Sequence, residues 1–173
     1  MREIILITLW TVFWLVIEST LLNGFPSQSV RCDFIFLSVV ALGFTCDWRE
    51  GFVPVVIIGI IADGISPAPF GIFIFLYLTA FAILRFAGAL IYVHSFVGRF
   101  TWISIASAAI LTIEGLLLMT IYGESYYMSY AMWRLLPQTL WNGLTGLFMV
   151  PFFGWYMELG WKKFFTPKGL VLR

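Results

Sequence analysis

The sequence has few charged residues, and this scarcity sets the class of protein. Only 11% of the 173 residues are charged, whereas about a quarter are charged in a typical soluble domain. Hydrophobic residues make up 61% of the chain, and the mean hydropathy is +0.98. The composition therefore predicts an all-α, polytopic integral membrane protein in which residues 1–173 form a single domain.

The sequence also has little of what catalysis or metal binding requires. The only histidine, His94, has no cysteine or carboxylate cluster nearby, and no phosphate-binding loop, H-E-x-x-H pattern or Ser, His, Asp set is present. The two cysteines, Cys32 and Cys46, would lie about 21 Å apart along one helix, too far for a disulfide. We therefore expect no enzyme activity, no cofactor and no metal site.

Long polar stretches are scarce. Short polar stretches separate the apolar runs, and these runs predict six membrane spans. The second and third runs are short for a bilayer of about 30 Å. They are nevertheless expected to be two separate helices in a tight hairpin, because one continuous helix would bury Asp47, Arg49 and Glu50 in hydrocarbon. The predicted spans are residues 4–22, 34–46, 52–65, 70–93, 101–122 and 135–157.

The basic residues indicate topology rather than nucleic-acid binding, because the ten Lys and Arg residues form no basic face and the net charge is +1. Six spans place both termini and the second and fourth loops on one side, with seven basic residues, against two on the other side. The positive-inside rule then predicts cytoplasmic termini. The seven are Arg2, Arg49, Arg99, Lys162, Lys163, Lys168 and Arg173.

The predicted fifth loop, residues 123–134, is rich in aromatic residues and methionine. Its sequence GESYYMSYAMWR has few charges, which is typical of a short helix lying in the outer membrane interface. A docking surface for another protein is the alternative interpretation. In the sixth span, Pro137 is expected in the first turn, where a missing N–H is harmless, and Pro151 is expected to kink the helix.

The stretch from Gly51 to Gly71 is predicted to be a packing centre. Gly59 and Gly64 would allow a neighbouring helix backbone to approach closely, which favours helix association in lipid. Asp63 lies near the end of the run, before the break at Ser66 and Pro67. We expect Asp63 to hold the end of this helix through hydrogen bonds, with Pro67 and Gly71 in the same packing or partner-binding segment.

Several polar residues fall inside the predicted spans, where each one is costly unless it is paired or hydrated. Arg85 is placed in the inner half as an intramembrane cation. The others lie in the outer half, where they could line a water-filled pocket. Alternatively, each acid bonds only a neighbouring helix. The outer-half residues are Glu18, Asp63, Glu114, Gln138 and Asn142.

The stretch from Gly51 to Gly71 also carries a family resemblance. A G-F start, an apolar run closing in G-x-x-x-D and then S-P-x-x-F-G before a long apolar helix resemble the bacterial rod shape-determining protein MreD family. The E-S-T end of the first span, Asp33 opening the second, the length and the basic tail are similar to that family as well. The resemblance is specific over residues 48–80.

This resemblance implies a non-enzymatic, multi-pass inner-membrane component of the cell-elongation machinery. Such a protein would bind the membrane protein MreC and support lateral peptidoglycan synthesis. It would act, directly or indirectly, with RodA, a transpeptidase of the penicillin-binding class and MreB. Membrane lipids are expected partners, and nucleic acid is not.

The fold implied by the resemblance is similar to that of the six-helix substrate-binding subunits of vitamin transporters. A small-molecule-binding transporter subunit is therefore the alternative function. In those subunits the first helix usually carries an A-x-x-x-A motif, and residues 1–22 contain no alanine. That absence favours the rod-shape interpretation.

Overall fold

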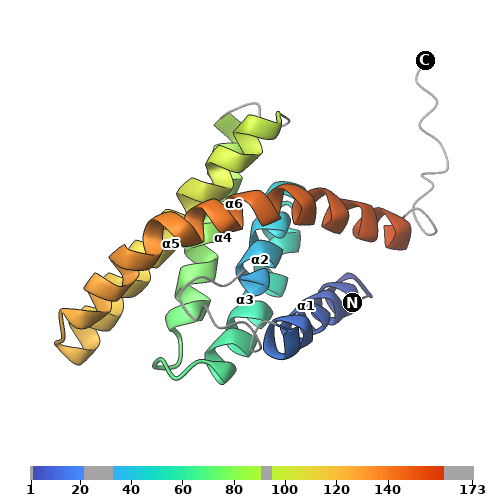
Figure 1. The fold of residues 1–173 in the computed structure, drawn as a ribbon. Helices are drawn as coiled ribbons and strands as arrows, with labels where there is room; N and C mark the ends of the chain where they lie inside the picture. The colour runs from blue at the N-terminus through green and yellow to red at the C-terminus, as the bar shows by residue number, and fades with distance from the viewer. Residues whose placement is uncertain (1, 22–32, 91–94, 162–173) are drawn as a thin grey trace, which may run out of the picture.

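The computed structural model describes residues 2–21, 33–90 and 95–161, and within these ranges the chain forms six helices and no strands (Figure 1). The predicted all-α class is confirmed. The helices are α1 (Arg2–Leu21), α2 (Phe34–Thr45), α3 (Trp48–Ile65), α4 (Ile72–Leu90), α5 (Phe96–Tyr122) and α6 (Tyr126–Trp161).

The second and third apolar runs form separate helices, as predicted. Asp33 caps α2, because its side chain accepts a hydrogen bond from the N–H of Phe36 at 2.8 Å. Helix α3 starts at Trp48, however, and its first turn contains Glu50. Its 18 residues extend about 27 Å, so the expected short third helix is wrong. The charged residues Arg49 and Glu50, which were expected to form a loop, instead belong to the first turn of α3.

Helix α2 lies at the centre of the molecule. Every residue from Phe36 to Gly43 is buried, and α2 contacts α1, α3, α4 and α6. Helix α2 is apolar on all sides, which is typical of a helix that is covered on every face. Figure 1 shows α2 enclosed by these helices, with α5 and α6 extending to one side as a long antiparallel pair.

The predicted fifth loop is much shorter than expected. Helix α5 ends at Tyr122 and is capped by Gly123, which adopts a left-handed φ of 71° and donates its N–H to the carbonyl of Met119 at 2.9 Å. Helix α6 then starts at Tyr126. The predicted separate interfacial segment at 123–134 is therefore wrong, because no proline or glycine interrupts residues 126–136 and α6 runs through all of them.

The early start of α6 also changes the place of Pro137. Pro137 lies inside a 36-residue helix rather than in its first turn, so its missing N–H deprives the carbonyl of Trp133 of a donor. The same helix contains Pro151. Figure 1 shows α6 curving along its length.

Close helix contacts in α5 and α6 depend on glycine. A Cβ atom placed on Gly143 would lie 2.5 Å from Ser104 Oγ, and one on Gly146 would lie 2.8 Å from Ile103 Cδ1. A Cβ on Gly115 would meet Ala131 Cβ at 2.7 Å. These glycines let the two helices approach closely enough to bury polar side chains between them.

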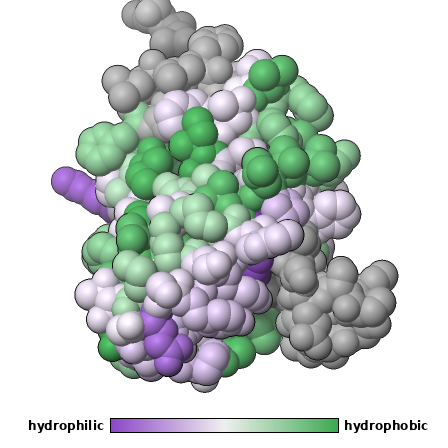
Figure 2. Space-filling view, turned by 60° about the vertical axis from the view of Figure 1, so that its left-hand side comes forward, coloured by the Kyte–Doolittle hydropathy of each residue, from purple (hydrophilic) through white to green (hydrophobic). Residues whose placement is uncertain are grey.

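The outer surface carries many exposed apolar side chains. Figure 2 shows hydrophobic residues over much of one face and strongly hydrophilic residues at only a few places. Within the described ranges, only α5 is both long and apolar enough to cross a membrane, while residues 34–45 and 72–86 form shorter apolar helices. The 27 residues of α5 extend about 40 Å. These features support association with a membrane.

Candidate functional site

A polar cavity of about 210 Å³ lies where α2, α4, α5 and α6 meet. Its charged residues come from the start of α2, the second half of α5 and the first half of α6. The lining residues are Asp33, Phe36, Phe73, Tyr77, Ser107, Ile110, Leu111, Glu114, Arg134, Gln138 and Asn142.

A hydrogen-bonded group centred on Asn142 forms one side of this cavity. Asn142 Nδ2 donates to Ser107 Oγ at 2.9 Å, and Asn142 Oδ1 accepts from Gln138 Nε2 at 3.5 Å and from the backbone N–H of Asp33 at 3.4 Å. Gln138, Asn142 and Ser107 are all buried. The group therefore connects α5 and α6 to the start of α2, and it fixes the cavity wall.

The charged groups of the cavity are not paired with one another. Neither Asp33 nor Glu114 forms an ion pair with Arg134, and the only ion pair among the described side chains lies elsewhere. Arg134 Nε is buried without a hydrogen-bond partner, while the guanidinium carbon lies 5.2 Å from the centre of the Tyr130 ring. A buried guanidinium N–H without an acceptor is costly, so this site has unused capacity for hydrogen bonding.

The environment of Asp33 disfavours its charged form. Burial raises the pKa of the Asp33 carboxyl above its ordinary value, while the N–H of Phe36 and the positive charge of Arg134 act in the opposite direction. Desolvation is thus the larger effect on this carboxyl. A positively charged group placed beside it would favour the carboxylate.

A second cavity, of about 190 Å³, lies beside Glu114 and Arg134. It shares Leu111, Glu114 and Arg134 with the polar cavity, so these side chains lie between the two. Tyrosines dominate the remainder of its wall. The other lining residues are Gly115, Leu118, Tyr126, Tyr127, Tyr130 and Ala131.

The structure brings together three of the five residues predicted to form an outer-half pocket. Glu114, Gln138 and Asn142 line the polar cavity. Asp63 does not line it, which corrects the prediction for that residue, and the Glu18 side chain lies outside the described part of the chain.

Arg134 and Asp33 were missed as members of this site. Arg134 was assigned to an external loop, and Asp33 was considered only as the residue that opens the second span. A helix extended back to Tyr126 places Arg134, Gln138 and Asn142 at four-residue spacing on one face. That spacing was the available signal for Arg134, while nothing in the sequence placed Asp33 next to α5.

Asp63 instead joins the end of α3 to the start of α4. It is buried, and its carboxylate accepts hydrogen bonds from the N–H groups of Gly71 at 2.9 Å, Phe73 at 2.9 Å and Ile74 at 3.4 Å. These N–H groups have no partner within α4, because the first turn of a helix lacks preceding carbonyls. The negative charge also interacts favourably with the positive end of the α4 dipole.

The other residues of this predicted packing segment have different roles. A Cβ on Gly59 would lie 2.7 Å from Ile74 Cα, so α3 and α4 are in close backbone contact there. Gly71 has a φ of +103°, which favours glycine. Pro67 lies in the exposed link between the helices. Gly64 meets no described atom within 4 Å of an added Cβ, so among the described residues no helix packs closely against it, unlike at Gly59.

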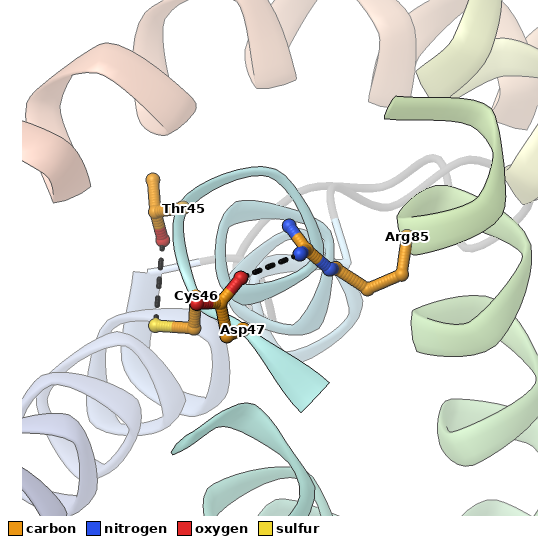
Figure 3. A network of polar contacts seen from close by, with 4 residues as sticks. All are labelled: Thr45, Cys46, Asp47 and Arg85. Carbon is orange, nitrogen blue, oxygen red and sulfur yellow. Dashed lines mark hydrogen bonds and ion pairs between the residues drawn. The ribbon is translucent and has the colours of Figure 1, made fainter. Parts of the chain in front are cut away.

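Arg85 pairs with Asp47 at the turn between α2 and α3. Arg85 Nη2 lies 2.6 Å from Asp47 Oδ1, and Figure 3 shows the two side chains pointing toward each other. The Asp47 side chain is 79% exposed, so water weakens this pair. Cys46, next to Asp47, is buried with its Sγ atom 3.7 Å from Thr45 Oγ1, and Cys32 lies outside the described residues.

Comparisons with protein-family models, with curated proteins and with solved structures find no match for this chain. In the described ranges, no three His, Cys, Asp or Glu side chains gather in a way that could hold a metal ion. The class defined by the fold is thus an all-helical protein with an apolar surface and one helix able to cross a bilayer.

Proposed function

We propose that this chain is a non-enzymatic, multi-pass inner-membrane component of the bacterial cell-elongation machinery, of the MreD kind. In this role it binds an MreC-like membrane protein and supports lateral peptidoglycan synthesis. RodA, a transpeptidase and MreB are then direct or indirect members of the same complex, and lipids contact the exposed apolar side chains.

The observation that carries this proposal is the α3–α4 junction. Three of the residues that resemble the family motif have a structural task there: Gly59 contacts the α4 backbone, Asp63 accepts three N–H groups and Gly71 takes a positive φ. A motif used to fix two helices relative to each other favours a scaffold that presents a rigid surface to a partner.

The proposed topology has six spans with cytoplasmic termini. Its support is the placement of charge, because Arg85 and Asp47 pair at the turn assigned to the cytoplasmic side. This pair means that the positive charge of Arg85 in α4 does not lie unpaired in hydrocarbon. Asp33, Glu114 and Arg134 gather at the opposite side, assigned to the exterior.

The test is recovery of the partner from the native membrane. An affinity-tagged full chain, extracted in mild detergent, is expected to retain an MreC-like protein, and its depletion is expected to convert rod-shaped cells to round ones. Another tagged polytopic protein from the same membrane, at matched abundance, controls for nonspecific recovery. Absence of the partner, together with unchanged cell shape on depletion, would exclude the proposed function.

The polar cavity keeps the alternative of a small-molecule-binding transporter subunit open. Its volume of about 210 Å³ is below the ~300–1,000 Å³ common for drug-sized ligands, which disfavours a vitamin. Recovery of ATPase subunits with the tagged chain, instead of an MreC-like protein, would support this alternative.

A further inference from the structure

The charged side chains of the polar cavity are close enough to line one space but do not satisfy one another. Arg134 has an unpartnered Nε, and neither Asp33 nor Glu114 forms an ion pair with it. A guanidinium has only donors, and an ionised carboxylate has only acceptors. Groups of opposite charge that face the same cavity without pairing are arranged to contact something placed between them.

The size of the cavity limits what that occupant can be. A volume of about 210 Å³ corresponds to roughly seven water molecules at ~30 Å³ each. This is room for a small polar compound or for the head group of a larger one. The second cavity, beyond Glu114 and Arg134, provides further space lined by Leu118, Ala131 and tyrosines.

The charges of the cavity define the chemistry of the occupant. An ammonium group has three donors and no acceptor, which suits two carboxyls that come from different helices. The Arg134 guanidinium requires an anion, and phosphate or carboxylate oxygens are its strongest partners. One compound that carries both groups would neutralise both ends of the cavity, whereas a simple cation or anion would neutralise only one.

We propose that this cavity binds a zwitterion of the phosphoethanolamine type, with its ammonium group at Asp33 and Glu114 and its phosphate at Arg134. The phosphoethanolamine group can come from a free compound or from the head group of phosphatidylethanolamine in the surrounding bilayer. If the group belongs to phosphatidylethanolamine, the second cavity holds the part of the lipid that is attached to the other side of the phosphate. This inference does not depend on the proposed role in cell elongation.

The experiment uses the full-length chain in nanodiscs made of phosphatidylglycerol alone. In the first arm, glycerophosphoethanolamine is titrated in and binding is followed by calorimetry. In the second arm, phosphatidylethanolamine is included in the bilayer, and its retention by the extracted protein is measured by native mass spectrometry. Saturable binding of one molecule per chain in either arm supports the proposal, and the arm identifies the source.

Two comparisons make the test specific. Ethanolamine alone and glycerophosphate alone are expected to bind at least about tenfold more weakly than the joined compound, because each meets only one end of the cavity. Arg134→Gln and Glu114→Gln are expected to weaken binding at least about tenfold. Glu124→Gln and Arg99→Gln, which line neither cavity, control for surface charge and should leave binding unchanged.

The proposal is overturned if neither arm gives saturable binding. Equal binding of the separated groups and the joined compound to the unmodified chain would also overturn it, and that comparison needs no variant to fold. So would unchanged affinity in both Arg134→Gln and Glu114→Gln when their elution profiles match that of the unmodified chain.

Discussion

The Asp63 carboxylate accepts three hydrogen bonds from the backbone. Both of its carboxylate oxygens accept N–H groups from the start of α4. Asp63→Leu should destabilise the protein by about 1–3 kcal/mol for each buried donor left without a partner. Asp63→Asn keeps one acceptor but turns an amide donor toward an N–H, so its loss should be intermediate. The measurement is the free energy of unfolding in detergent.

Asp47→Asn is the matched control for Asp63, because it alters an exposed carboxylate that makes one ion pair and should change stability by at most about 1 kcal/mol. If Asp63→Asn retained normal stability and abundance but lost the MreC-like partner, a purely structural role for Asp63 would be contradicted. The charge itself would then contribute to partner binding.

The raised pKa of Asp33 predicts a pH-dependent effect of substitution. Because burial raises this pKa in the folded chain, the Asp33 contribution to stability is greatest in acid and is lost as the pH rises through the folded-state pKa. Asp33→Asn keeps a helix-capping acceptor and cannot become charged. Its melting temperature should exceed that of the unmodified chain at neutral and alkaline pH, and the difference should shrink in acid.

Melting curves of both chains across pH, without added ligand, measure this difference. Glu114 is present in both chains, but it feels the Asp33 charge, so the difference reports the Asp33 carboxyl together with its repulsion of Glu114. Both contributions destabilise the unmodified chain as the pH rises. A difference that stays constant with pH, or one that grows in acid, would contradict the inferred direction of the pKa shift.

At the scale of the helices, Gly59 and Gly64 form a matched pair on α3. Gly59→Leu should separate α3 from α4, since even a Cβ would lie 2.7 Å from Ile74 Cα, and overpacking of this kind costs about 1–3 kcal/mol. Gly64→Leu meets no described neighbour and gains up to about 1 kcal/mol of helix propensity. The melting temperatures of the two variants in detergent should therefore shift in opposite directions from that of the unmodified chain. Equal destabilisation of both variants would contradict this packing.

The continuity of α6 through residues 126–134 can be tested with proline. Met132→Pro would interrupt a helix at a side chain that is 46% exposed, so the expected loss of about 3 kcal/mol or more comes from the backbone. Tyr126→Pro is the control, because the first helical position tolerates proline. A stable Met132→Pro variant in an unfolding assay would indicate that this segment is not part of α6.

At the scale of the whole molecule, the proposed topology predicts which segments are reachable from each side of the membrane. A reporter fused after Arg173 should be active only in the cytoplasm. A single cysteine in the turn 123–125, in an otherwise cysteine-free chain, should react with a membrane-impermeant thiol reagent added to the outside. Cysteine in place of Arg49 should be protected in intact cells and react after lysis. The opposite labelling pattern would exclude six spans with cytoplasmic termini.

Some features of this protein were determined by the sequence alone. Low charge and long apolar runs required helices, because a helix satisfies its own backbone hydrogen bonds without water. The break between α2 and α3 was also predictable, since Asp47, Arg49 and Glu50 could not lie inside one apolar helix. Asp63 was correctly expected to hold the end of α3, because a buried carboxylate near a helix end requires N–H partners.

Other features were decided only by the tertiary structure. Asp33 and Glu114 are 81 residues apart in the sequence and line one cavity because α2 packs against α6, and α6 against α5. Arg134 lines the same cavity because α6 extends back to Tyr126 along α5. Gly59 packs against α4 while Gly64 faces away. Local sequence gives the propensity of each segment, but which helix faces meet depends on the packing of distant segments, so composition and spacing could not supply the site.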